Sequence, residues 1–179
     1  MKTLTLLRHA KSDMGEPGMR DFDRPLNAKG HRAAAAVGRH LKGLGIGFDA
    51  VVASPAARVT DTLDEFGRAF GGLPVPQWDK RAYLASAPML LDLIHAADDS
   101  VERLLLVGHN PGLEELALDL VPDDSDERRG DVEEKFPTAS VAVIEFAVDS
   151  WAEVANGAGR LVRFIRPRDI DPALGPGQD

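Results

Sequence analysis

The chain contains no cysteine, which excludes disulfides, a thiolate nucleophile and every cysteine-based metal site. Aromatic residues are also scarce, at 6% of the 179 residues, with one tyrosine and two tryptophans. No apolar run approaches the roughly 20 residues that a membrane-spanning helix needs. The N-terminal residues show no signal-peptide pattern. These absences predict a cytoplasmic protein that does not insert into a membrane.

Lysine and arginine are fewer than aspartate and glutamate, which gives a formal net charge of −8, and no segment of the chain is dense in lysine and arginine. This balance argues against a nucleic-acid partner. Hydrophobic residues make up 44% and charged residues 28% of the chain, as in ordinary globular proteins. The length suits one domain with a full core. We therefore expect a single domain over residues 1–170 and a flexible tail, rich in proline and glycine, over residues 171–179.

Short apolar runs alternate with helical patterns along the chain, which predicts β-α-β units and an α/β fold with a mostly parallel sheet. Strands are expected over residues 3–7, 50–53, 75–78, 104–107, 139–146 and 160–165. Helices are expected after the capping residue Asn27, from Pro55, from Pro88 and around Leu113. The charged segment 122–135 predicts a solvated loop.

Arg8 and His9 follow the first expected strand, at its carboxyl end. In open α/β sheets this is the edge where ligands bind. Arginine offers a planar, permanently charged fork that suits phosphate, and histidine offers a neutral nitrogen nucleophile at physiological pH. A single histidine after a strand is more commonly a structural residue, so the pair needs support from elsewhere in the chain.

Two further strand ends provide that support. His109 follows the strand at 104–107 and precedes a glycine-containing turn and a helix, and Arg58 lies in the first turn of the helix that follows the strand at 50–53. If these residues converge, the arginines can hold phosphoryl oxygens and His109 can donate hydrogen bonds to them. His9 can then attack phosphorus, and water can hydrolyse the resulting phosphohistidine.

This route requires no metal ion and no other cofactor. The sequence shows no aspartate cluster and no HxH or HxxxH spacing of the kind that binds metals. We therefore expect neither a metal site nor a cofactor.

Four segments carry a resemblance to a known family. They are residues 8–12 (RHAKS), 21–26 (DFDRPL), 54–58 (SPAAR) and 107–112 (VGHNPG). They resemble the signature segments of the histidine phosphatase superfamily, whose fold is phosphoglycerate-mutase-like. They are most similar to its SixA-type phosphohistidine phosphatase branch. The resemblance covers about residues 3–165 and implies a three-layer α/β/α sandwich and a covalent phosphohistidine intermediate.

The resemblance also implies roles for single residues. His9 matches the family's nucleophile, Arg8 and Arg58 match its phosphate-binding arginines, and His109 matches its second pocket histidine. The adjacent polar residues Lys11 and Asn110 are further candidates for substrate binding.

A general acid is harder to find in this chain. Family members that cleave phosphate esters usually carry Glu or Asp in the segment that matches residues 78–84, where this chain offers only Asp79. An alkoxide leaving group gains roughly 10²–10⁴ in rate from such an acid. Imidazole, with a conjugate-acid pKa of about 6.5, needs far less help. The missing acid favours a phosphohistidine substrate, although Asp13 or Asp21 could also supply the proton.

The leading prediction is thus a phosphohydrolase that acts on a phosphorylated partner, preferentially a phosphohistidine protein. Two alternatives stay open at this point. One is a small-molecule phosphomonoesterase or mutase of the same superfamily, and the other is a non-catalytic phosphate-binding module. The complete set of two histidines and two arginines argues against the module, because a phosphate-binding protein has no need of a nucleophile.

Overall fold

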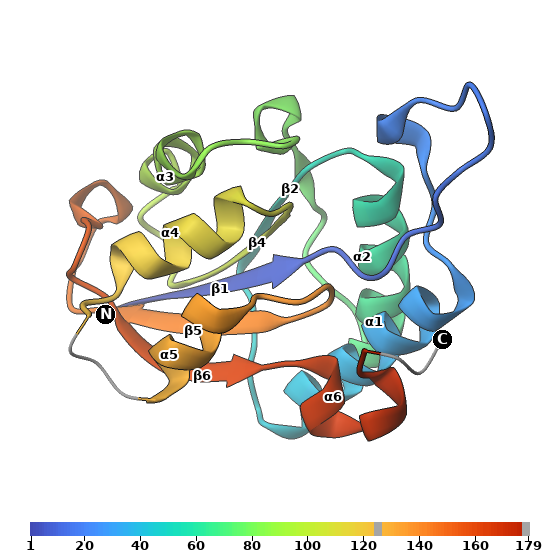
Figure 1. Ribbon diagram of the computed structural model, residues 1–179. Helices are drawn as coiled ribbons and strands as arrows, with labels where there is room; N and C mark the ends of the chain where they lie inside the picture. Colours follow the sequence, from blue (N-terminus) through green and yellow to red (C-terminus); the bar gives the residue numbers. More distant parts are fainter. Residues whose placement is uncertain (124–126, 177–179) are drawn as a thin grey trace.

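Six strands form one central sheet in the computed structural model, which describes residues 1–123 and 127–176 (Figure 1). They are β1 (Lys2–Arg8), β2 (Ala50–Ala53), β3 (Gln77–Trp78), β4 (Arg103–Gly108), β5 (Val141–Phe146) and β6 (Arg160–Ile165). Their order in the sheet is β3-β2-β4-β1-β5-β6. The first four strands pair in parallel, and β5 runs antiparallel to both β1 and β6. The predicted mostly parallel sheet is confirmed.

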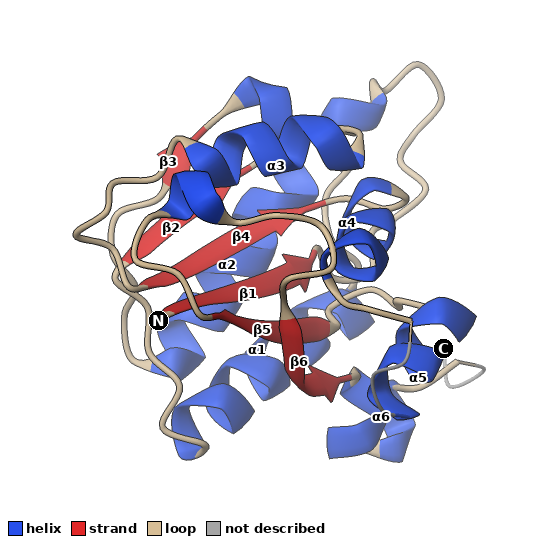
Figure 2. Cartoon of the chain, turned by 90° about the vertical axis from the view of Figure 1, so that its left-hand side faces the viewer, coloured by secondary structure: helices blue, strands red, loops and turns tan. Residues whose placement is uncertain are grey.

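Helices cover both faces of this sheet. They are α1 (Ala28–Gly43), α2 (Ala57–Phe70), α3 (Ala87–His95), α4 (Gly112–Leu120), α5 (Glu127–Glu134) and α6 (Pro167–Ile170). The helices α1 and α2 lie on one side of the sheet, and α3 and α4 lie on the other (Figures 1 and 2). The expected three-layer α/β/α sandwich is therefore present.

The strand pattern explains why two separate cores form. Alternate residues of a strand point to opposite faces of a sheet. In β4, Leu104 and Leu106 pack with α3 and α4, whereas Leu105 and Val107 pack with α1 and α2. All four side chains are buried, so β4 is apolar on both faces, as expected for a central parallel strand.

Local signals in the sequence set the helix starts. The Asn27 side chain accepts a hydrogen bond from the Gly30 amide, and Ser86 caps α3 in the same manner. The second helix begins at Ala57, two residues later than predicted from Pro55. Ala56 remains extended, and its amide donates to the Ser54 hydroxyl, which delays the first helical turn.

The predicted loop over residues 122–135 was wrong for its second half, because α5 occupies Glu127–Glu134. Within the described part of this helix only Val132 is buried, so its sequence shows no apolar stripe. Tertiary contacts supply the missing stabilisation. Arg129 donates to the carbonyl oxygens of Leu118 and Val121 at the end of α4, and Arg128 donates to that of Leu161 in β6. Residues 124–126 of the predicted loop lie outside the described residues.

The expected flexible tail also needs correction for residues 171–176. A short 3-10 helix spans Pro172–Leu174, and the buried Lys29 ammonium donates to the Gly175 carbonyl oxygen over 2.6 Å. These contacts tie the segment to α1. Residues 177–179 lie outside the described residues.

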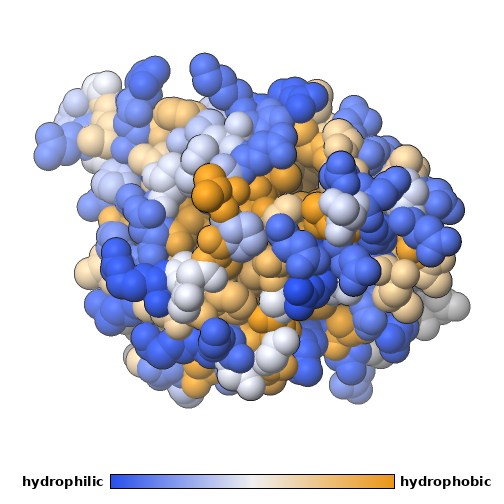
Figure 3. Space-filling view, turned by 180° about the vertical axis from the view of Figure 1, so that it is seen from behind, coloured by the Kyte–Doolittle hydropathy of each residue, from blue (hydrophilic) through white to orange (hydrophobic). Residues whose placement is uncertain are grey.

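Polar side chains cover most of the rear face of the molecule, around a smaller apolar area near its centre (Figure 3). Among the described residues, no helix combines the length and the apolar character that crossing a membrane demands.

Candidate active site

The sheet topology brings the predicted residues together. Arg8 and His9 lie at the carboxyl end of β1, His109 follows β4, and Arg58 lies in the first turn of α2 after β2. These three strands are parallel neighbours, so their carboxyl ends meet at one edge. All four side chains line one cavity of about 390 Å³. The ring centroids of His9 and His109 are 5.2 Å apart.

The contacts of His9 define its protonation. Its Nδ1 lies 2.7 Å from the Ala10 carbonyl oxygen, which can only accept, so Nδ1 carries the proton. The lone pair is therefore on Nε2, which accepts a hydrogen bond from Arg58 Nε over 3.4 Å. Burial, with smaller contributions from His109 and the two arginines, lowers the pKa of His9 to about 3. The imidazole is thus neutral at pH 7, and its Nε2 lone pair, held only by a long hydrogen bond from Arg58, can attack an electrophile.

Two arginines line the same cavity as this nitrogen. Arg58 is almost fully buried and is held by Asp21, whose backbone oxygen accepts from Nη1 over 2.8 Å and whose carboxylate accepts from Nη2 over 3.0 Å. Arg8 donates from Nη1 to the Phe136 carbonyl oxygen over 3.0 Å, and its buried Nε has no hydrogen-bond partner in the described structure. Buried donors are normally paired, so an unpaired one beside a cavity suits an anionic ligand.

Asp21 organises the mouth of the cavity. Its carboxylate accepts hydrogen bonds from the Tyr83 hydroxyl, Arg58 and Arg24. The Tyr83 bond is the largest of the causes that lower the pKa of Asp21, which falls to about 2. From the sequence, Asp21 was predicted only as one of the carboxylates that could supply a proton to the leaving group. Its bond to Tyr83 joins positions 62 residues apart and has no local signature.

His109 is oriented by a residue that sequence reasoning did not single out. Its Nε2 lies 2.8 Å from Oγ of the buried Ser54. Ser54 Oγ also accepts from the Ala56 amide, and we assign its hydroxyl proton to the bond with His109 Nε2. The ring proton then lies on Nδ1, which is buried and has no hydrogen-bond partner in the described structure. Burial, followed by the charge of Arg58, lowers the pKa of His109 to about 4.

Comparisons with known proteins agree with this geometry. The family model of the histidine phosphatase superfamily (branch 1) matches residues 4–81. The uncharacterized protein Rv1276c of Mycobacterium tuberculosis is 36% identical over 167 residues, which cover 90% of this chain and 100% of the relative. This chain belongs to the histidine phosphatase superfamily.

Two solved structures are similar to this histidine phosphatase over nearly their whole length. One is described as a putative phosphohistidine phosphatase SixA from Agrobacterium tumefaciens, with 31% identity and a TM-score of 0.79 over 93% of this chain and 98% of that one. The other, a putative SixA from Nakamurella multipartita, has 29% identity and a TM-score of 0.81 over 93% and 96% of the two chains. The predicted family, its fold and the phosphohydrolase class are confirmed.

The remaining candidate residues of this histidine phosphatase lie in different places. Lys11 and Asn110 line the cavity, and the Asn110 amide donates to the same Phe136 oxygen that Arg8 uses. Asp79 is not among the residues that line it. Its carboxylate is bound by the Arg81 backbone amide and, through two further bonds, by the Arg81 guanidinium. The structure thus brings six of the seven candidates together and leaves Asp79 outside.

Lowering the pH from 7 to 5 should reduce the free energy of unfolding. The folded-state pKa values of His9 and His109 lie below the unfolded value of about 6.5, so the unfolded chain takes up protons that the folded chain does not. Stability present above about pH 6.5 is therefore lost as the pH falls, by up to about 2 kcal/mol per histidine at pH 5.

Urea unfolding at both pH values tests this sign. A variant that combines His9→Ala with His109→Ala should lose less stability on acidification than the wild type or the control His40→Ala, which alters a histidine outside the cavity. Equal losses in all three proteins would contradict the burial of the two rings.

Proposed function

We propose that this protein is a metal-independent phosphatase that forms a phosphohistidine on His9 and takes phosphohistidine in a protein as its substrate. The observation that carries the proposal is the neutral His9 ring, whose Nε2 lone pair lies beside the Arg58 guanidinium in a cavity that Arg8 and His109 also line. This arrangement supports the proposal, because a neutral histidine nitrogen shares one cavity with three side chains of the kinds that bind phosphoryl oxygens.

The reaction takes two steps. In the first, His9 Nε2 attacks phosphorus and a P–N bond forms, while the bond from phosphorus to the substrate's imidazole nitrogen breaks. The substrate ring carries a proton on its other nitrogen, taken up from solvent, so it leaves as neutral imidazole. In the second, water attacks phosphorus, the bond to His9 breaks, and inorganic phosphate leaves while the water proton passes to solvent. Arg8, Arg58 and the Nδ1 proton of His109 stabilise the charge on the phosphoryl oxygens in both steps.

The leaving group decides between substrate classes. Asp21 is the carboxylate that lines the cavity, and its pKa of about 2 keeps it ionised and engaged with Tyr83 and Arg58. Asp79, outside the lining, is occupied by Arg81. The alkoxide of an alkyl phosphate ester would therefore leave without an effective general acid, whereas imidazole departs more readily. The similarity to structures described as SixA supports the same choice.

A substrate panel tests the proposed specificity. Purified protein should hydrolyse a phosphohistidine peptide with a higher kcat/KM than p-nitrophenyl phosphate, and both with a higher kcat/KM than a sugar phosphate. A higher kcat/KM for the sugar phosphate than for the peptide would reject the proposal and favour a small-molecule phosphomonoesterase.

Asp79→Asn should change kcat/KM less than about twofold for all three substrates, because the carboxylate lies outside the cavity lining. Steady-state kinetics on the same panel provide the measurement. A decrease of tenfold or more in kcat/KM for the sugar phosphate alone is equivalent to about 1.4 kcal/mol in the barrier. It would identify Asp79 as the general acid for alkyl esters and overturn this assignment.

Chelators should leave the activity unchanged, because every step of the proposed route is performed by side chains and water. Activity is measured after incubation with EDTA and exhaustive dialysis. Loss of turnover that is restored by one divalent ion would contradict a metal-independent mechanism. The described residues contain no group of three or more histidine or carboxylate side chains that could hold a metal.

A further inference from the structure

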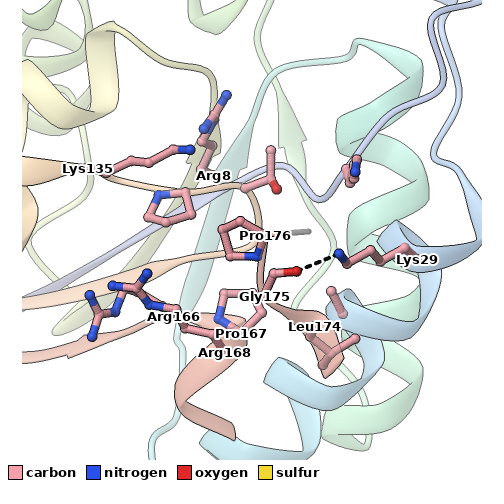
Figure 4. A pocket seen from close by; sticks show the side chains of 13 residues that line it. Arg8, Lys29, Lys135, Arg166, Pro167, Arg168, Leu174, Gly175 and Pro176 are labelled. Carbon is pink, nitrogen blue, oxygen red and sulfur yellow. Dashed lines mark hydrogen bonds between the residues drawn. The ribbon is translucent and has the colours of Figure 1, made fainter. Parts of the chain in front are cut away.

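A second cavity lies beside the active site and is rich in positive charge. It has a volume of about 390 Å³ (Figure 4). The cationic residues that line it are Arg8, Lys11, Lys29, Lys135, Arg166 and Arg168. In the described part of the chain no aspartate or glutamate lines it. This concentration stands out in a chain whose net charge is −8.

The two cavities are continuous in their lining. Arg8, Lys11 and Thr138 line both of them, so the two cavities lie side by side around these three residues. Elements far apart in sequence form the second cavity: β1, the start of α1, the segment between α5 and β5, and the start of α6. The cations are therefore gathered by the fold and do not form a local sequence cluster.

Some of these six cationic side chains already have hydrogen-bond or ion-pair partners within the protein. Lys29 donates to the Gly175 carbonyl oxygen, as the dashed line in Figure 4 marks, and Arg166 is paired with Asp169 over 3.0 Å. Arg8 donates to the Phe136 carbonyl oxygen. Lys135 and Arg168 are exposed, and the Lys135 ammonium makes no side-chain hydrogen bond or ion pair within the described residues. These two side chains are the ones best able to turn toward a ligand.

We propose that this cavity is a subsite for a second anionic group of the substrate, namely an aspartate or glutamate side chain that lies near the phosphohistidine in the substrate protein. The inference rests on the proposed phosphohistidine specificity and deepens it. Lysine and arginine at this density bind carboxylates and phosphates. Because the protein as a whole carries negative charge, it repels acidic proteins at long range. A local cationic cavity would attract the carboxylate of such a substrate and so position its phosphohistidine next to His9.

The exposed rim of the cavity favours a protein side chain over a small free anion. Lys135 and Arg168 are open to solvent, where an approaching surface can meet them. Proline residues 137, 167 and 176 contribute short, rigid walls. A carboxylate that hangs from a substrate segment can enter between these walls while its phosphohistidine occupies the neighbouring pocket.

The test compares two phosphohistidine peptides that differ only at the residues flanking the phosphohistidine, which are aspartate in one and alanine in the other. The wild type should show a KM about five- to tenfold lower for the acidic peptide, with a similar kcat. The double variant Lys135→Gln/Arg168→Gln should lose this preference by an increase in KM for the acidic peptide alone. Its kcat/KM for the alanine peptide should change less than twofold.

A matched control separates the subsite from the overall charge. The variant Arg32→Gln/Arg39→Gln removes the same number of charges from the exposed face of α1, away from both cavities. It should retain the acidic preference, and 0.5 M NaCl should weaken that preference in the wild type.

Two results would overturn the inference. They are equal KM values of the wild type for the two peptides, or an equal effect of the two double variants. In either case hydrolysis of the alanine peptide would still support the proposed function. Failure to hydrolyse either peptide, with activity on p-nitrophenyl phosphate, would instead reject the proposed function and the subsite with it.

Discussion

Replacing His9 with alanine should lower kcat by at least about 10³-fold on every substrate, because the covalent route then loses its nucleophile. The variant should still fold. His9 follows the end of β1, and its ring lines the cavity. Its main hydrogen bond goes to the adjacent Ala10 carbonyl oxygen, so the ring links no distant parts of the fold through that bond. Single-turnover and steady-state kinetics on the phosphohistidine peptide measure the loss, and far-ultraviolet circular dichroism checks the fold.

His40→Ala is the matched control for this experiment, since it removes a histidine that does not line the catalytic pocket. It should retain activity within about twofold. Turnover by His9→Ala above a few per cent of the wild-type rate would show that another group attacks phosphorus.

Arg58→Ala should have the second-largest effect, a loss of roughly 10²–10³-fold in kcat, since its guanidinium lies beside His9 Nε2 and would neutralise charge on the transferred phosphoryl group. Arg58→Lys should restore only part of the loss. Lysine retains the charge but lacks the planar fork that reaches both His9 and the Asp21 carboxylate. The kcat and KM of both variants are to be measured on the same phosphohistidine peptide.

Because Arg58 also anchors Asp21, the test must separate chemistry from positioning. Asp21→Asn keeps the guanidinium but removes the charge of its partner and replaces one acceptor oxygen by an amide nitrogen, so it should reduce kcat much less than Arg58→Ala. Equal losses in the two variants would mean that Arg58 acts mainly by holding the Asp21 segment. The control Arg39→Ala, on the exposed face of α1, should leave kcat unchanged.

The core of the site could be predicted from sequence because each member lies at a strand end or in the first turn of the helix that follows one. Strands β1, β2 and β4 are short apolar runs, and the rule that parallel strands place their ligands at the carboxyl edge needs no further contact information. That rule predicts that His9, His109 and Arg58 lie together at one edge of the sheet. The helix cap at Asn27 shows the same agreement between local sequence and fold.

Other parts depend on contacts that no local pattern reports. The helix α5 has one buried apolar residue in its described part, and arginine bonds to distant carbonyl oxygens secure it. The bond from Tyr83 to Asp21 links two loops, so neither residue alone predicts it. Asp79 had the right residue type near the expected position, yet Arg81, two residues away, occupies its carboxylate. Such pairings are decided by tertiary geometry rather than by propensity.

The second cationic cavity is a further case of this kind. Its residues are spread from Arg8 to Arg168, and the sequence shows no dense basic segment. The negative net charge of the whole chain gives no indication of a local cluster of positive charge. Only the packing of α6 and the C-terminal segment against α1 places these side chains around one space.

The most direct measurement is to trap the phosphoenzyme and locate its phosphate. Wild-type protein is mixed with ³²P-labelled phosphohistidine peptide, quenched within milliseconds in alkaline denaturant and digested for mass spectrometry. The account predicts one acid-labile phosphate per chain, on His9, and none on His9→Ala. A label on any other residue, or burst-free turnover with no label on the wild type, would contradict the covalent mechanism on His9.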